Sequence, residues 1–183
     1  MPENLNEAIQ YISKNLAPKA DIGIVLGSGL GQVAVELNPE KDLPYEEIPF
    51  FPVSRVKGHE GKLLLCHVAG KTVLVLQGRF HYYEGYTMRG VTFPIRALAR
   101  LGVTEVILTN AAGGLNRHYR SGDFMLIDDH INLMGDNPLI GPADEELGLR
   151  FVDMKDAYDR DLLKSAEEIG RKLELPVRKG VLA

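Results

Sequence analysis

The sequence predicts a protein of the α/β class. Three short apolar runs, at residues 21–26, 72–76 and 105–108, are rich in β-branched side chains and are typical of buried strands. Longer segments with the periodicity of amphipathic helices lie before, between and after them. A chain of 183 residues is long enough to bury a substantial core. We therefore expect a single α/β domain over residues 1–183.

The first third of the chain predicts helix, strand, helix and loop in that order. Residues 4–16 indicate a helix, because their apolar side chains recur at every third or fourth position. The strand at 21–26 leads through a glycine-rich turn into a short helix at 30–37. Residues 39–61 are rich in proline and charge, which favours a long loop over the functional site.

The rest of the chain continues the alternation. Residues 91–101 predict a helix, with Pro94 in its first turn and Gly102 just past its end. The remaining predicted elements are strands at residues 72–76, 105–108 and 124–127, a charged amphipathic helix at 159–173, and a strand that begins after Pro176.

The first strand ends in the turn at residues 27–31, whose sequence is GSGLG. Glycines allow the backbone to approach a ligand closely, and the N–H groups of the turn and of the helix that follows attract anions. The hydroxyl of Ser28 adds a donor. The alternative is a tight turn with no ligand.

A second strand end carries Arg79 and His81. A guanidinium group is well shaped for a bidentate contact with an oxyanion, and an imidazole can donate to the same anion. If the chain stays extended here, Arg79, His81 and Tyr83 share one face. The alternative is a surface arginine beside an aromatic cluster.

The third strand end is followed by the small-residue turn of Asn110 and Ala111. Small residues let the backbone come close to a ligand, and an asparagine amide both donates and accepts. Ligands collect at the carboxyl ends of strands in α/β sheets. We therefore predict one anion site, built by Ser28, Arg79, His81 and the turn at Asn110 and Ala111.

Composition excludes several other classes of function. The chain has 21 basic and 25 acidic residues, a net charge of −4, and no basic stripe for a nucleic acid. No apolar stretch approaches the length of a membrane span. The single cysteine, Cys66, is expected to be buried, and we expect a cytoplasmic protein. The five histidines lack metal-ligand spacing, so we predict no metal site.

The glycine-rich turn also resembles two other motifs, each in part. A nucleophile elbow needs glycine where Leu26 stands. A dinucleotide-binding enzyme needs its third glycine one residue after Gly31, and an acid at the end of the next strand. A non-catalytic protein that only folds or assembles is a further alternative.

Several uncommon strings in one order resemble the trimeric class of purine nucleoside phosphorylases. They are VLGSGLG, GHEG, GRFHYYEGY, VTFPIRAL, TNAAGGLN, DHINLMGDNPLIGP and RFVDMKDAYD, running from about Ala20 to the last residue. The resemblance implies a mixed, partly barrel-like sheet surrounded by helices. It also implies phosphorolysis of purine (deoxy)ribonucleosides to a free base and a pentose 1-phosphate in purine salvage. Inorganic phosphate is the co-substrate, with no metal or organic cofactor.

The resemblance assigns roles to residues that match the motifs. It implies that phosphate is bound by Ser28, Arg79, His81, His59 and the backbone at Ala111. It places Tyr83 at the ribose, and Asn110 and Ala111 where phosphate, ribose and base meet. His81 and Asn110 are thereby the expected catalytic residues.

The resemblance also predicts the assembly and the extent of the chain. Phe151 matches an aromatic residue that this family lends to a neighbouring subunit's ribose pocket, which implies a homotrimer. The family continues beyond the position of Ala183 into a C-terminal third that recognises the base. We therefore expect a truncated phosphorylase whose base preference is set outside this sequence, with a non-catalytic remnant that keeps the phosphate site as the alternative.

Overall fold

The computed structural model describes residues 2–16, 19–27, 29–53, 61–142 and 148–183. The chain divides into two compact units, Met1–Ala111 with Asp144–Gly148, and Ala112–Ala143 with Leu149–Ala183. Each unit is described by itself. Two such units can belong to one domain, so the expectation of a single domain stays a prediction.

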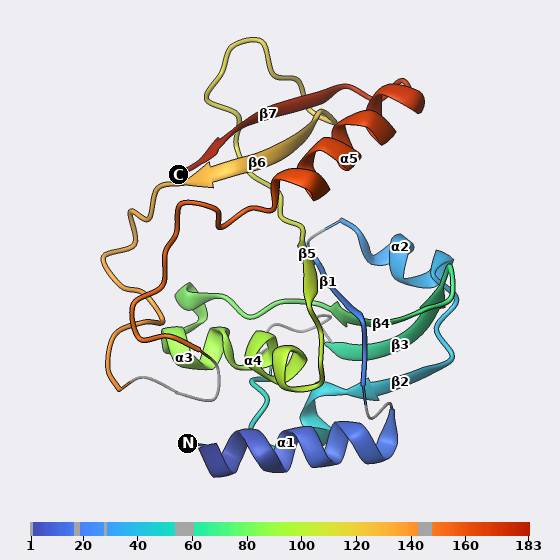
Figure 1. Ribbon diagram of the computed structural model, residues 1–183, viewed down its shortest axis with the longest axis vertical. Coiled ribbons are helices and arrows are strands. Elements are labelled where there is room, and N and C mark those ends of the chain that lie inside the picture. Colours follow the sequence, from blue (N-terminus) through green and yellow to red (C-terminus); the bar gives the residue numbers. More distant parts are fainter. Residues whose placement is uncertain (1, 17–18, 28, 54–60, 143–147) are drawn as a thin grey trace. The chain divides into compact units, whose positions relative to one another are not determined.

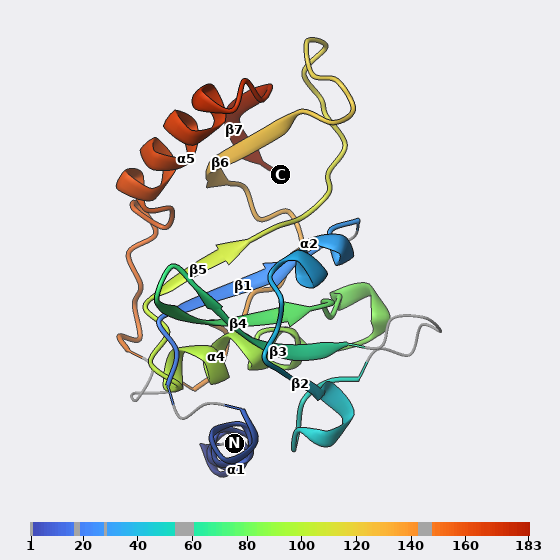
Figure 2. The ribbon, with the colours of Figure 1, turned by 90° about the vertical axis from the view of Figure 1, so that its right-hand side faces the viewer.

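The first unit is built on a five-stranded sheet with the order β2-β3-β4-β1-β5 (Figures 1 and 2). Its strands are β1 (Ile22–Leu26), β2 (Lys41–Pro44), β3 (Lys62–Val68), β4 (Lys71–Gln77) and β5 (Glu105–Leu108). β2, β3 and β4 pair antiparallel, whereas β4, β1 and β5 run parallel. The expected mixed sheet is confirmed. It is open, since β2 and β5 form its two edges, so among the described residues it does not close into a barrel.

Helices cover both faces of this sheet. They are α1 (Pro2–Asn15), α2 (Gly31–Glu36), α3 (Met88–Val91) and α4 (Phe93–Arg100), with two 3-10 turns, η1 (Tyr45–Glu47) and η2 (Tyr82–Glu84). The predicted helices at 4–16 and 30–37 are confirmed as α1 and α2. The predicted helix at 91–101 is instead divided at Thr92, because Pro94 lacks an N–H and sits in the first turn of a new helix, α4.

Both faces of β3 and β4 are buried, and successive side chains enter different clusters. Leu63, Leu65, Leu74 and Leu76 pack in one cluster with residues of α1 and α4. The alternating positions, Leu64, Cys66, Val73 and Val75, pack on the other face with Ala34 of α2. Cys66 is therefore buried as expected, and burial raises the pKa of its thiol.

The loop predicted at residues 39–61 is wrong for its first part. Lys41–Pro44 pairs with β3 as the edge strand β2, and Tyr45–Glu47 forms η1. Leu43 and Tyr45 are buried there, and the Tyr45 ring packs against Phe80 with 5.1 Å between centroids. Pairing with β3 and burial of these two side chains offset the weak strand preference of proline and charge. Residues 54–60 lie outside the described residues.

The second unit is a strand–helix–strand unit (Figure 1). β6 (Phe124–His130) pairs parallel with β7 (Val177–Leu182), and α5 (Arg160–Lys172) lies between them in sequence. The carboxylate of Asp159 caps α5 by accepting from the N–H of Leu162 at 2.8 Å. The helix and strands predicted for this part of the chain are confirmed, with β6 longer than expected. No described helix is long and apolar enough to span a membrane.

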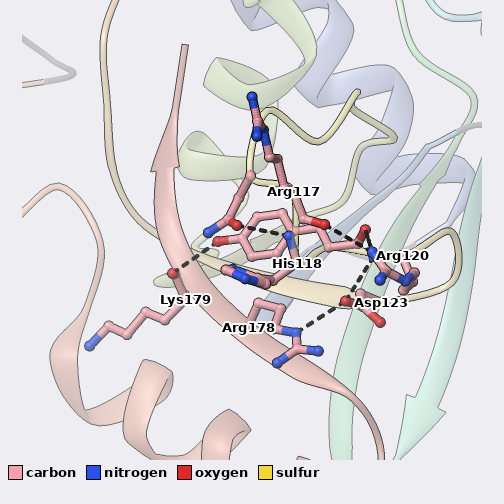
Figure 3. A network of polar contacts seen from close by, with 8 residues as sticks. Arg117, His118, Arg120, Asp123, Arg178 and Lys179 are labelled. Atoms are coloured by element: carbon pink, nitrogen blue, oxygen red, sulfur yellow. Dashed lines mark hydrogen bonds and ion pairs between the residues drawn. The ribbon is translucent and has the colours of Figure 1, made fainter.

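A polar network ties the turn before β6 to β7 (Figure 3). The Asp123 carboxylate accepts from Arg178 Nε at 3.0 Å and from the backbone N–H of Arg120 at 3.1 Å. The hydroxyl of Tyr119 donates to the carbonyl of Lys179 at 3.5 Å. The hydrogen bond from Arg178 and then that from Arg120 lower the pKa of Asp123.

This network predicts a pH-dependent contribution to the stability of the second unit. Because the folded-state pKa of Asp123 is lowered, its contribution is present above the ordinary aspartate pKa of about 4 and is lost as the pH falls through the lowered value. We expect Asp123→Asn to speed hydrogen exchange in β6 and β7 at neutral pH. The difference from the wild type should shrink below about pH 4. An equal difference at both pH values would contradict this role.

Candidate functional site

The carboxyl ends of the parallel strands β4, β1 and β5 lie side by side at one end of the sheet (Figure 2). β1 lies between β4 and β5, with Leu26 opposite Gln77 and Val25 opposite Leu108. The chain therefore leaves all three strands at nearly the same level. The predicted juxtaposition of these strand ends is confirmed, and it lies where α/β sheets bind ligands.

Thr109, the first residue after β5, is bonded to the end of β1. Its hydroxyl accepts from the N–H of Gly27 at 2.8 Å and donates to the carbonyl of Val25 at 2.8 Å. Its own N–H donates to the Val25 carbonyl at 3.1 Å. A Cβ added to Gly27 would lie 2.7 Å from the Thr109 carbonyl oxygen and 3.2 Å from Cα of Asn110. Glycine is required at position 27, because the two backbones are in direct contact.

Arg79 reaches the same point from the end of β4. Its Nη1 donates to the carbonyl of Thr109 at 3.1 Å, and the side chain is partly buried. Gly78 before it has a φ of 101°, a conformation that glycine adopts readily, and its carbonyl accepts from the Tyr45 hydroxyl at 3.1 Å. A guanidinium has five N–H donors, so the bond to Thr109 orients the group while leaving it able to bind an anion.

His81 is held by an acidic side chain three residues later. Its Nδ1 lies 2.7 Å from Oε1 of Glu84, which also accepts from the His81 backbone N–H at 3.1 Å. The Glu84 side chain is only 8% exposed, whereas that of His81 is 29% exposed. An ionised carboxylate only accepts hydrogen bonds, so Nδ1 carries a proton and Nε2 is the nitrogen left for other chemistry.

An extended chain over residues 79–83 was the condition for Arg79, His81 and Tyr83 to share one face, and the structure does not meet it. Residues Tyr82–Glu84 form η2, which ends at Gly85 with a φ of 89°. The bonds from His81 to Glu84 close this turn, as in a capping box. His81 and Tyr83 nevertheless lie together, with rings stacked 4.7 Å apart at an angle of 18°. The Tyr83 side chain is 81% exposed.

The remaining predicted residues divide into three groups. Asn110 and Ala111 are exposed beside the Gly27 contact, in the unit that holds Arg79 and His81. Phe151 belongs to the second unit, is 87% exposed, and has the Arg150 guanidinium 5.7 Å from its ring centroid. Ser28 and His59 lie outside the described residues.

Two residues of this site were not singled out from the sequence. Thr109 stands directly before the small-residue turn, but a lone threonine after a strand carries no signal of its own. Glu84 lies three positions after His81, the spacing of a capping box, and this signal was available. Over the part of the chain that the structure describes, no three His, Cys, Asp or Glu side chains are grouped as metal ligands.

Comparison with known proteins identifies a family and close structural relatives. Residues 21–183 match the family model described as the phosphorylase superfamily. The chain is 51% identical over 181 residues to purine nucleoside phosphorylase 1 of Bacillus subtilis, covering 99% of this chain and 67% of that protein. It is 43% identical to purine nucleoside phosphorylase of Rattus norvegicus, covering 94% of this chain and 62% of that protein.

Solved structures of purine nucleoside phosphorylases also resemble this chain. Isoform 2 of the Schistosoma mansoni enzyme, in complex with cytosine and ribose-1-phosphate, superposes with a TM-score of 0.91 at 43% identity, covering 98% of this chain and 65% of that chain. The S. mansoni enzyme in complex with inosine superposes with a TM-score of 0.88 at 40% identity, covering 98% of this chain and 65% of that chain. The chain spans between 52% and 67% of the length of curated relatives that it matches.

Proposed function

Since the chain belongs to the phosphorylase superfamily, among the purine nucleoside phosphorylases, we propose a phosphate site at the carboxyl ends of β1, β4 and β5. This site, called the three-strand edge below, would bind phosphate for the phosphorolysis of purine nucleosides. The observation that carries the proposal is the position of Arg79. It is fixed on the Thr109 carbonyl beside the glycine turn, where three parallel strands end.

The chemistry of this edge favours an oxyanion of the size of phosphate. Arg79 supplies a permanent positive charge and a planar set of donors. His81, whose Nδ1 is held by Glu84, offers Nε2, which donates a hydrogen bond as an imidazolium or accepts one from the P–OH of monohydrogen phosphate as a neutral ring. Ser28, His59 and the backbone N–H at Ala111 complete the proposed phosphate ligands.

Phosphate is also the nucleophile in the proposed reaction. The bond from the anomeric carbon to the purine nitrogen breaks, its electron pair leaves with the base, and a phosphate oxygen bonds to the same carbon. Positive charge grows on the ribose, as in glycoside hydrolysis, and a phosphate dianion beside that carbon stabilises it. Holding the two substrates in line can remove about 7–11 kcal/mol of the barrier. No covalent bond to the protein is needed.

The nucleoside contacts follow from the same edge. Tyr83 is exposed and stacked on His81, so its ring is available to a ribose next to the phosphate. Asn110, beside the Gly27 turn, presents an amide that can donate or accept where ribose and base meet. The departing purine takes up a proton. We propose no metal or organic cofactor, and a cytoplasmic role in purine salvage.

We further propose that the working enzyme is a homotrimer in which Phe151 enters a neighbouring subunit's ribose pocket. An aromatic side chain that is 87% exposed is well suited to such a contact. If the site is shared, Phe151→Ala and Arg79→Ala variants should each lose activity, and mixed trimers of the two should regain part of it. Confirmed mixing without any rescue would contradict a shared site.

The test of the function is release of hypoxanthine from inosine by the purified chain, with and without phosphate. Release that depends on phosphate supports the proposal, and release without phosphate contradicts phosphorolysis. The melting temperature is measured in the same samples with phosphate or with NAD. A rise with phosphate and no release of hypoxanthine would identify a non-catalytic form that keeps the anion site. A rise with NAD alone would favour a nucleotide-cofactor enzyme.

A further inference from the structure

We propose that Thr109 is a positioning residue that holds the glycine turn and Arg79 in place for the same anion. This inference rests on the proposed phosphate site and adds to it a residue that acts through the groups it holds. Thr109 lies where β5 ends, and its contacts reach the ends of both β1 and β4.

The side chain of Thr109 fixes the start of the glycine turn. Its hydroxyl closes a two-bond bridge across the end of β1, accepting from Gly27 N–H and donating to the Val25 carbonyl, both at 2.8 Å. Only a hydroxyl can accept and donate at one atom in this way. The bridge holds the first residue of the turn in register with the end of β5.

The backbone of Thr109 fixes the arginine. Its carbonyl accepts from Arg79 Nη1 at 3.1 Å, so the position of the guanidinium depends on the position of this peptide. The same carbonyl oxygen lies only 2.7 Å from the position that a Cβ of residue 27 would take. The Thr109 peptide therefore contacts Gly27 on one side and the Arg79 guanidinium on the other. The threonine hydroxyl holds this peptide against Gly27.

The contacts of Thr109 matter for function because they hold groups of the proposed anion site in place before the anion binds. A guanidinium and a turn that are already in place bind an anion without ordering side chains and backbone at the same time. Loss of the hydroxyl should leave every phosphate-contacting group present but less well placed. The effect should therefore fall on phosphate affinity more than on the stability of the fold.

The test compares Thr109→Val, which keeps the shape but removes the hydroxyl, with Thr109→Ser, which keeps the hydroxyl. Thr104→Val is the matched control, because Thr104 is exposed just before the same strand. Calorimetric titration of the full chain with inorganic phosphate should give a Kd raised about 5- to 30-fold in Thr109→Val, for two lost hydrogen bonds. Thr109→Ser and Thr104→Val should stay within about 3-fold of the wild type.

A second measurement tests the hydroxyl bridge of Thr109 in the absence of a ligand. Hydrogen exchange of the peptide containing Gly27 should be faster in Thr109→Val and unchanged in Thr109→Ser, and the melting temperature of Thr109→Val should fall by no more than about 2–8 °C. If the wild type binds phosphate and Thr109→Val binds it equally well, the positioning role is overturned and the phosphate site stands. If the wild type does not bind phosphate, the proposed site itself is overturned. Unchanged hydrogen exchange at Gly27 in Thr109→Val also overturns the positioning role of Thr109, whatever the phosphate affinity.

Discussion

Replacing Arg79 with alanine is expected to weaken phosphate binding by about 10- to 150-fold, the effect of losing a charged hydrogen-bonding group worth about 1.5–3 kcal/mol. Arg79 is held at the three-strand edge by the hydrogen bond from its Nη1 to the Thr109 carbonyl. Its removal takes away the charge and the donors together. Calorimetric titration with inorganic phosphate measures the change directly, and in a catalytically active form the KM for phosphate should rise in parallel.

Arg79→Lys is the matched control for the charge. Lysine keeps the positive charge but lacks the planar set of donors, so phosphate affinity should fall between those of the wild type and Arg79→Ala. The binding of nucleoside should change less than that of phosphate in both variants. Phosphate affinity that is unchanged in Arg79→Ala would remove this residue from the anion site.

Replacing Leu74 with alanine is expected to lower the free energy of unfolding by about 2–5 kcal/mol, the cost of a large cavity in a close-packed core. Leu74 is completely buried in β4, the strand that pairs with both β3 and β1. It packs in the same cluster as residues of α1 and α4. The stability of the first unit, measured by urea unfolding, should fall accordingly.

Leu108→Ala is the matched control, because Leu108 lies in the same sheet but is 63% exposed. Its cost should stay within about 1 kcal/mol. Leu74→Ile conserves volume, should cost less than about 1.5 kcal/mol, and gives a measurable value if the alanine variant does not fold. Similar losses for Leu74→Ala and Leu108→Ala would contradict the assignment of the core.

The sequence by itself determined the elements whose signals are local. Alternating or continuous apolar residues predicted β1, β4, β5 and β6, and helical periodicity predicted α1 and α5, because each pattern is set by neighbours within a few positions. Glycines followed by donors at strand ends also predicted an anion site there. The motifs of the resemblance, long and in fixed order, indicated the family that the comparisons then identified.

Other features depended on partners distant in sequence. The strand β2 forms only because β3 offers it an edge, so proline and charge made residues 41–44 resemble a loop. The turn η2, closed by Glu84, stands where β4 could have continued, because a local hydrogen-bonded turn competes with the strand.

The parallel register is what brings Gly27, Arg79 and Thr109 together, from positions up to 82 residues apart. Their hydrogen bonds depend on distances of a few ångströms between separate strands, and no local pattern encodes such distances. Sequence determined which strand ends carry donors; the tertiary structure decided that these ends meet and that a threonine hydroxyl bridges two of them.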